Sequence, residues 1–139
     1  MIYIDTSVLV AYYYPEEKSS EVEHLLINTD RPAISQLIAV EFTSALSKKI
    51  REHTLTKQDG VKLIALFRDH IRHKSFYNLP VKPNHYSKAS SWISLFTTPL
   101  RTLDALHLAI AQENDITIVT SDVKLAGAAD FLKVKFQFI

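Results

Sequence analysis

The sequence contains no cysteine and only two glycines, Gly60 and Gly127. Without cysteine the chain forms no disulfide, thiolate zinc site, iron–sulfur cluster or cysteine nucleophile. Two isolated glycines exclude the glycine-rich loops that bind phosphate in P-loop and dinucleotide-binding proteins. No charge-free apolar stretch approaches the roughly 20 residues of a transmembrane helix, and residues 1–14 carry Asp5 but no basic residue, unlike a signal peptide. We therefore expect a cytoplasmic protein without a membrane partner.

The composition is that of an ordinary globular protein. Of the 139 residues, 47% are hydrophobic and 22% are charged, which separates the chain from disordered sequences. No internal repeat, low-complexity tract or proline- and glycine-rich linker divides it. The sequence therefore predicts one domain over residues 1–139.

Charge is unevenly distributed along the chain. Residues 1–47 contain seven acids and two bases, residues 48–82 contain nine bases and three acids, and residues 83–139 contain five of each. The basic middle segment is compatible with nucleic-acid binding. Charge alone, however, favours the alternative of two solvated helix faces.

Short apolar runs alternate with helical patterns along the sequence. Strands are expected at 2–4, 32–34, 76–80, 116–119 and 134–138. Helices are expected at 8–14, from Ser19 or Ser20, from Ser35 to 53, from Thr56 to 73, at 84–97, from Thr102 through the apolar run 105–111, and at 122–129. This alternation predicts an α/β protein with a mainly parallel sheet and helices on both faces.

Four acidic residues stand where such a sheet would place a binding site, beyond the carboxyl ends of its strands. Asp5 directly follows the first strand, Glu41 lies two turns into the helix after the second, Asp104 opens the apolar helix, and Asp122 follows the fourth strand. Asp5 and Asp122 are also good N-cap residues, and Asp104 suits the first turn of a helix. The position of each of these three acids therefore allows both a capping and a functional interpretation.

Glu41 is harder to explain as a structural residue. It lies on the shoulder of the apolar face of its helix, where an unpaired carboxylate is costly, and Asp104 has similarly apolar neighbours. If the four acids converge, their repulsion calls for a cation, and ligation by oxygen alone suits Mg²⁺ or Mn²⁺. His107, one turn after Asp104, either donates a hydrogen bond to it or simply packs.

The sequence resembles the PIN-domain ribonucleases, and in particular the VapC toxins of toxin–antitoxin pairs. Together with length and strand order, the resemblance covers essentially the whole chain, and it departs modestly from many relatives after Asp122. The segments that carry it are Ile4-Asp5-Thr6-Ser7-Val8-Leu9, Ser35-Gln36-Leu37 with Val40-Glu41, Leu103-Asp104-Ala105-Leu106-His107-Leu108-Ala109, and Thr120-Ser121-Asp122.

The resemblance implies a PIN-like three-layer sandwich whose sheet has the strand order 3-2-1-4-5. It also implies that Asp5, Glu41, Asp104 and Asp122 form the catalytic, metal-binding set, with Ser121 and Thr6 or Ser7 in support. The implied activity is an Mg²⁺- or Mn²⁺-dependent endoribonuclease, since a divalent ion activates water and steadies charge on the scissile phosphate. The implied partners are an RNA substrate, a cognate antitoxin and a second copy of the chain.

Three other functions remain alternatives. A PIN-like module that binds RNA or a partner without cutting it is disfavoured because all four acids are present. A phospho-acceptor signalling domain would carry paired acids after the first strand and an aspartate after the third, where this chain has Thr6-Ser7 and Leu79-Pro80. A phosphatase with an Asp-x-Asp motif is disfavoured because Ser7 occupies the second position.

Overall fold

Five short strands form one sheet, and seven helices pack around it, in the computed structural model, which describes residues 1–139. The elements follow one another as β1 (Ile2–Ile4), α1 (Thr6–Tyr13), α2 (Ser19–Ile27), β2 (Ala33–Ser35), α3 (Gln36–Arg51), α4 (Lys57–Arg72), β3 (Tyr77–Leu79), α5 (Pro83–Ile93), α6 (Thr102–Glu113), β4 (Thr117–Thr120), α7 (Val123–Phe131) and β5 (Phe136–Phe138).

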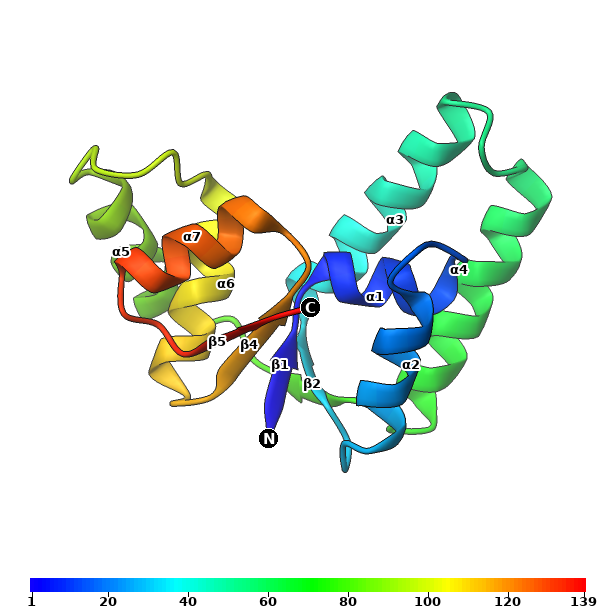
Figure 1. The fold of residues 1–139 in the computed structure, drawn as a ribbon, viewed down its shortest axis with the longest axis horizontal. Coiled ribbons are helices and arrows are strands. Elements are labelled where there is room, and N and C mark those ends of the chain that lie inside the picture. Colours follow the sequence, from blue (N-terminus) through cyan, green and yellow to red (C-terminus); the bar gives the residue numbers. More distant parts are fainter.

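The sheet has the strand order β3-β2-β1-β4-β5, and each of its four neighbouring pairs is parallel. Helices α5, α6 and α7 lie on one side of the sheet and α1 to α4 on the other, with α3 and α4 projecting as a long antiparallel pair (Figure 1). This architecture confirms the expected α/β sandwich and its strand order. It also places the carboxyl ends of β1 and β4 next to each other, where the order of connection reverses.

Alternation along the central strand β1 divides the interior into two cores. Tyr3 packs into the core shared with α5, α6 and α7, whereas Ile4 packs into the core shared with α1, α3 and α4. Successive side chains of a strand point to opposite faces, so neighbouring residues serve different helical layers. Both side chains are fully buried.

The most apolar segment of the sequence forms the most buried helix. All seven residues from Ala105 to Ala111 in α6 are buried, His107 among them. A helix that is apolar on nearly all sides is expected to be buried on nearly all sides. None of the helices, α6 included, combines the length and apolarity needed to span a bilayer.

Two helix starts differ from the sequence prediction. Helix α2 has Lys18 as its N-cap with no side-chain hydrogen bond, because Ser19 Oγ instead donates to the carbonyl of Ala11 at 2.7 Å. Helix α6 has Arg101 as its N-cap, again without a side-chain bond, and Thr102 is its first helical residue. Predicting these serine and threonine caps was therefore wrong by one residue.

Two other starts fall where the sequence predicts them but use their hydroxyls differently. Thr56 Oγ1 accepts the backbone N–H of Asp59 and caps α4 as expected. Ser35 is the N-cap residue of α3, yet its Oγ makes no capping bond and is paired with Tyr3 Oη at 2.8 Å. A tertiary contact has taken the place of a local one.

Helix α5 is shorter than the expected segment 84–97. It ends at Ile93, and Phe96 three residues later has φ of +53°. A residue with left-handed backbone angles at that point cannot continue a right-handed helix, so the helical segment ends before residue 97.

Candidate active site

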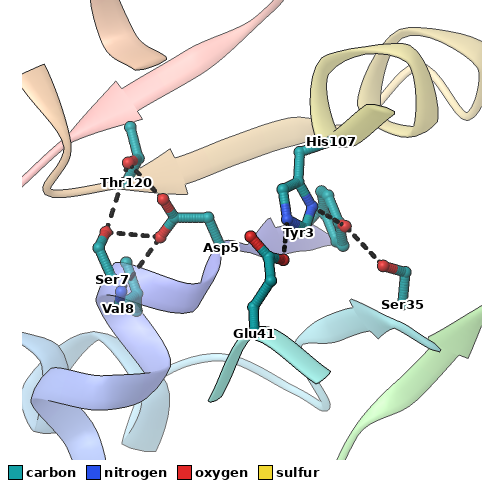
Figure 2. A network of polar contacts seen from close by, with 8 residues as sticks. All are labelled: Tyr3, Asp5, Ser7, Val8, Ser35, Glu41, His107 and Thr120. Atoms are coloured by element: carbon teal, nitrogen blue, oxygen red, sulfur yellow. Dashed lines mark hydrogen bonds and ion pairs between the residues drawn. The ribbon is translucent and has the colours of Figure 1, made fainter. Parts of the chain in front are cut away.

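Asp5 is the centre of a hydrogen-bond network at the carboxyl end of β1. Its Oδ1 accepts bonds from Ser7 Oγ at 2.6 Å and from the Val8 N–H at 3.1 Å, and its Oδ2 accepts a bond from Thr120 Oγ1 at 2.6 Å (Figure 2). The first oxygen therefore caps α1, as the sequence allowed. The second accepts a bond from β4, so capping accounts for only one of the three hydrogen bonds to this carboxylate.

The same network joins the segments that follow β1 and β4. Ser7 Oγ accepts the Ser121 N–H at 2.9 Å, and Thr120 Oγ1 accepts the Asp122 N–H at 2.9 Å. Asp122 Oδ1 accepts two backbone N–H groups in the first turn of α7, which makes it the N-cap of that helix. The other carboxylate oxygen of Asp122, Oδ2, makes no hydrogen bond.

Burial dominates the electrostatics of Asp5. Only 4% of the residue is exposed, and this desolvation raises the pKa of its carboxyl above the ordinary value. The hydrogen bonds from Ser7, Thr120 and Val8 lower the pKa and offset part of the shift. The fold therefore holds this carboxylate in one orientation at an electrostatic cost.

Asp104 feels the charge of two other acids. It lies in the first turn of α6 with its side chain 23% exposed, and Arg101 Nε is 4.0 Å away. Its pKa is raised mainly by burial and then by the negative charge of Asp122, with Glu41 adding to the shift. Acids from α3, α6 and the end of β4 therefore share one region of negative potential.

Glu41 reaches this region from α3 and is held by a buried histidine. Its Oε2 lies 2.5 Å from His107 Nε2, and its side chain is 17% exposed. The sequence had suggested that His107 donates to Asp104 or only packs, and that prediction was wrong. The partner that Glu41 needs is this imidazole.

Thr6 stands apart from the network that includes Ser7 and Ser121. Its Oγ1 is buried without a hydrogen-bond partner. Of the two neighbouring hydroxyls that the sequence offered in support of the site, Ser7 is therefore the one that contacts Asp5.

The donor set suits a hard divalent cation in its chemistry, because it consists of carboxylates and hydroxyls. The repulsion that raises the pKa of Asp104 is of the kind a cation would relieve. No three acidic or histidine side chains, however, stand close enough together to hold an ion as they are arranged. Holding one would require rotation of at least part of the set.

Sequence reasoning missed two residues of this region, Thr120 and Tyr3. Thr120 enters the sequence argument only through the motif Thr120-Ser121-Asp122, although a polar residue at the end of a buried strand is itself a signal of a site. Tyr3 was assigned to an apolar run, and its hydroxyl, which meets both Ser35 and His107, gave no periodicity signal.

A family model and several solved structures match nearly the whole length of this chain. The family model described as PIN domain matches residues 2–130, and no curated protein sequence matches closely enough to indicate a relative. VapC20 of Mycobacterium tuberculosis, described as a sarcin-ricin loop cleaving toxin, superposes with a TM-score of 0.73 at 16% identity and covers 92% of this chain and 95% of its own. VapBC2 of Rickettsia felis, bound to a DNA fragment from its promoter, gives 0.67 at 18% identity over 100% and 99%. FitAcB of Neisseria gonorrhoeae gives 0.70 at 19% identity over 100% and 97%.

Proposed function

Because the chain belongs to the PIN-domain family, we propose that it is a divalent-metal-dependent endoribonuclease of the VapC type. The observation that supports this proposal is that the charges of Asp122 and Glu41 both act on Asp104, while Asp5 lies at the end of β1, the strand next to the one that Asp122 follows. Fold similarity to VapC20, a sarcin-ricin loop cleaving toxin, supports it as an analogy.

The four acids contribute in different ways. Asp5 is already fixed by the Ser7 and Thr120 hydroxyls, so its carboxylate has little orientational freedom to lose on binding. Asp122 keeps one carboxylate oxygen free while the other caps α7. Asp104 and Glu41 supply the remaining oxygens from two helices on opposite sides of the sheet. A divalent cation held there would polarise the scissile phosphate and make water a better nucleophile.

RNA cleavage by the purified protein tests this proposal. We expect cleavage of a structured RNA in Mg²⁺ or Mn²⁺, none in EDTA, and none of a DNA of the same sequence. Asp104→Asn should lower the cleavage rate by at least about 100-fold, because it removes a metal ligand without changing side-chain volume. Asp130→Asn, which changes an exposed acid of α7, is the matched control. Equal cleavage by wild type and Asp104→Asn would refute the assignment.

The proposal includes an antitoxin and a second copy of the chain. The similar structures include a toxin–antitoxin complex from Klebsiella pneumoniae and VapBC2 of Rickettsia felis. A short open reading frame directly upstream should encode the antitoxin. Its product, added in equimolar amount, should abolish cleavage and co-elute with the protein in size-exclusion chromatography.

A module that binds RNA without cleaving it is the alternative. The observation in its favour is that no three potential ligands converge on one point in the present arrangement. The two functions differ in a simple assay. A non-catalytic module retains RNA binding in EDTA and releases no cleavage product after prolonged incubation with Mn²⁺.

A further inference from the structure

Three side chains form a continuous polar path through the core between the sheet and α6. Ser35 Oγ and Tyr3 Oη are 2.8 Å apart, Tyr3 Oη and His107 Nδ1 are 2.5 Å apart, and His107 Nε2 reaches Glu41 Oε2 (Figure 2). Ser35, Tyr3 and His107 are at most 2% exposed. The path therefore begins in the dry interior and ends on one of the four acids.

The chemistry of the groups gives the path a direction. An ionised carboxylate only accepts hydrogen bonds, so the proton between His107 and Glu41 belongs to Nε2. In an imidazole with one proton, Nδ1 is then the acceptor, and the Tyr3 hydroxyl donates to it. Tyr3 Oη in turn accepts from Ser35 Oγ. Each bond is made by a donor pointing towards Glu41.

Nothing else in the structure orients Glu41. Its carboxylate makes no other hydrogen bond or ion pair, whereas Asp5 is held by three donors. Glu41 also lies on α3, in the helical layer opposite to α6. Rotation of the His107 ring would therefore change where Glu41 points, and the hydrogen bond to the other nitrogen of that ring comes from Tyr3.

Apolar side chains could replace a buried polar path of this kind with little loss of stability. Replacing all partners of a buried hydrogen-bonded set by apolar groups of similar shape is often nearly neutral for stability. The surrounding core is apolar, with Leu106, Leu108 and Ile118 among its fully or almost fully buried members. A purely structural role accordingly gives no reason for three polar side chains at this place.

We propose that Tyr3 and His107 are positioning residues, which hold Glu41 in the orientation needed for metal binding and RNA cleavage. The inference rests on the proposed function, and it adds two residues that contact neither metal nor RNA. Mutating a residue that hydrogen-bonds to a metal ligand commonly lowers metal affinity or activity by about 10- to 100-fold.

The chain provides its own control for this proposal. Tyr13 Oη lies 2.6 Å from His70 Nδ1 in the opposite core, and Tyr13 is 6% exposed. This second tyrosine–histidine pair has the same atoms in contact, but no carboxylate is hydrogen-bonded to His70. Tyr13→Phe therefore removes an equivalent hydroxyl without touching the path to Glu41.

The experiment compares wild type, Tyr3→Phe and Tyr13→Phe in two measurements. Mn²⁺ binding is measured calorimetrically without RNA, and kcat and KM are measured on a structured RNA. Tyr3→Phe should weaken Mn²⁺ binding by about 10-fold or more and lower kcat by a similar factor, with KM unchanged. Tyr13→Phe should stay within about twofold of wild type in both.

His107→Gln and His107→Leu extend the comparison. Glutamine carries a terminal N–H₂ able to donate to Glu41, so it should restore part of the Mn²⁺ affinity that leucine abolishes. If Tyr3→Phe does not fold, Ser35→Ala takes its place, because it removes the first donor of the path and leaves both rings. A smaller loss of affinity in the same direction is then expected.

Three outcomes separate the two proposals. Wild type that neither binds Mn²⁺ nor cleaves RNA refutes the proposed function and this inference with it. Active wild type with unchanged Tyr3→Phe refutes the positioning role alone. Equal losses in Tyr3→Phe and Tyr13→Phe also refute it, because they assign both hydroxyls to general stability.

Discussion

The two sides of the sheet each bury a tyrosine–histidine pair, Tyr3 with His107 beneath α6 and Tyr13 with His70 between α1 and α4. The first pair continues to Ser35 and Glu41 and is closed to solvent, whereas the second ends at a half-buried His70. In both, burial raises the pKa of the tyrosine hydroxyl, which keeps it protonated and able to donate. The same pair of side chains thus anchors a helix on one side and orients an acid on the other.

The histidines should give the largest difference between the two sides. His107→Ala leaves Glu41 without its only hydrogen-bond donor and removes one of the two partners of the buried Tyr3 hydroxyl, and should lower the free energy of unfolding by about 3 kcal/mol. His70→Ala loses one hydrogen bond at a half-buried position, at a cost of about 1 kcal/mol. Urea denaturation of both variants measures the difference. Similar losses of stability in the two variants would mean that the hydrogen bonds of His107 stabilise the fold no more than the single bond between Tyr13 and His70.

Asp5 lies where the two sides meet, and its replacement should stabilise the protein when metal is removed. Burial raises the folded-state pKa of Asp5, so its contribution to stability is full below the ordinary pKa and is lost as pH rises through the folded value. Asp5→Asn does not ionise and keeps the capping oxygen. In EDTA at pH 7 it should gain about 1 kcal/mol, or roughly 2–4 °C in Tm.

Two further melts complete the test of Asp5. Millimolar Mg²⁺ should raise the Tm of wild type and raise that of Asp5→Asn much less, because only a folded protein that binds the ion is stabilised by it. Asp122→Asn, at a half-buried N-cap where asparagine caps as well as aspartate, should match wild type in EDTA within about 0.5 kcal/mol. Identical melting of wild type and Asp5→Asn with and without Mg²⁺ would contradict a shared metal site.

The two glycines, one on each side, should respond oppositely to alanine. A Cβ on Gly127 in α7 would meet nothing within 4 Å, so Gly127→Ala should add about 0.5–1 kcal/mol through helix propensity. A Cβ on Gly60 in α4 would lie 2.8 Å from Ile50 Cδ1. Displacing that methyl group should cancel the gain at Gly60. Chemical denaturation measures the change in the free energy of unfolding for both variants. An equal gain would show that the Ile50 side chain moves aside at little cost.

The smallest effect at neutral pH is expected at His85, which is buried on α5 and accepts the Lys82 N–H on Nδ1 at 2.9 Å. Burial lowers its pKa, so the unfolded chain takes up the proton first and stability should fall as pH drops below about 6.5. His85→Gln keeps an acceptor for that N–H and does not titrate. It should match wild type at pH 8 and show a shallower loss of stability between pH 6.5 and 5; an unchanged slope would exclude His85 as the cause.

Local periodicity predicted much of the fold. The β-favouring run at 2–4 and the apolar run at 105–111 identified β1 and α6 because period and apolarity are properties of neighbouring residues. Helix starts were less predictable, since Ser35 and Ser19 each had a competing tertiary or loop partner for the same hydroxyl. Strand order came from resemblance to a family, because a chain of alternating strands and helices is compatible with several orders.

The sequence by itself determined which residues are acids at strand ends and which segments are strands or helices, because both depend on residue types a few positions apart. Only the tertiary structure decided that Glu41 is held by His107, 66 residues away, and that Tyr3 rather than Ile4 faces it. Such contacts depend on which faces of distant elements are packed together. That packing is set by the sum of many weak contacts across the whole core, which no local pattern contains.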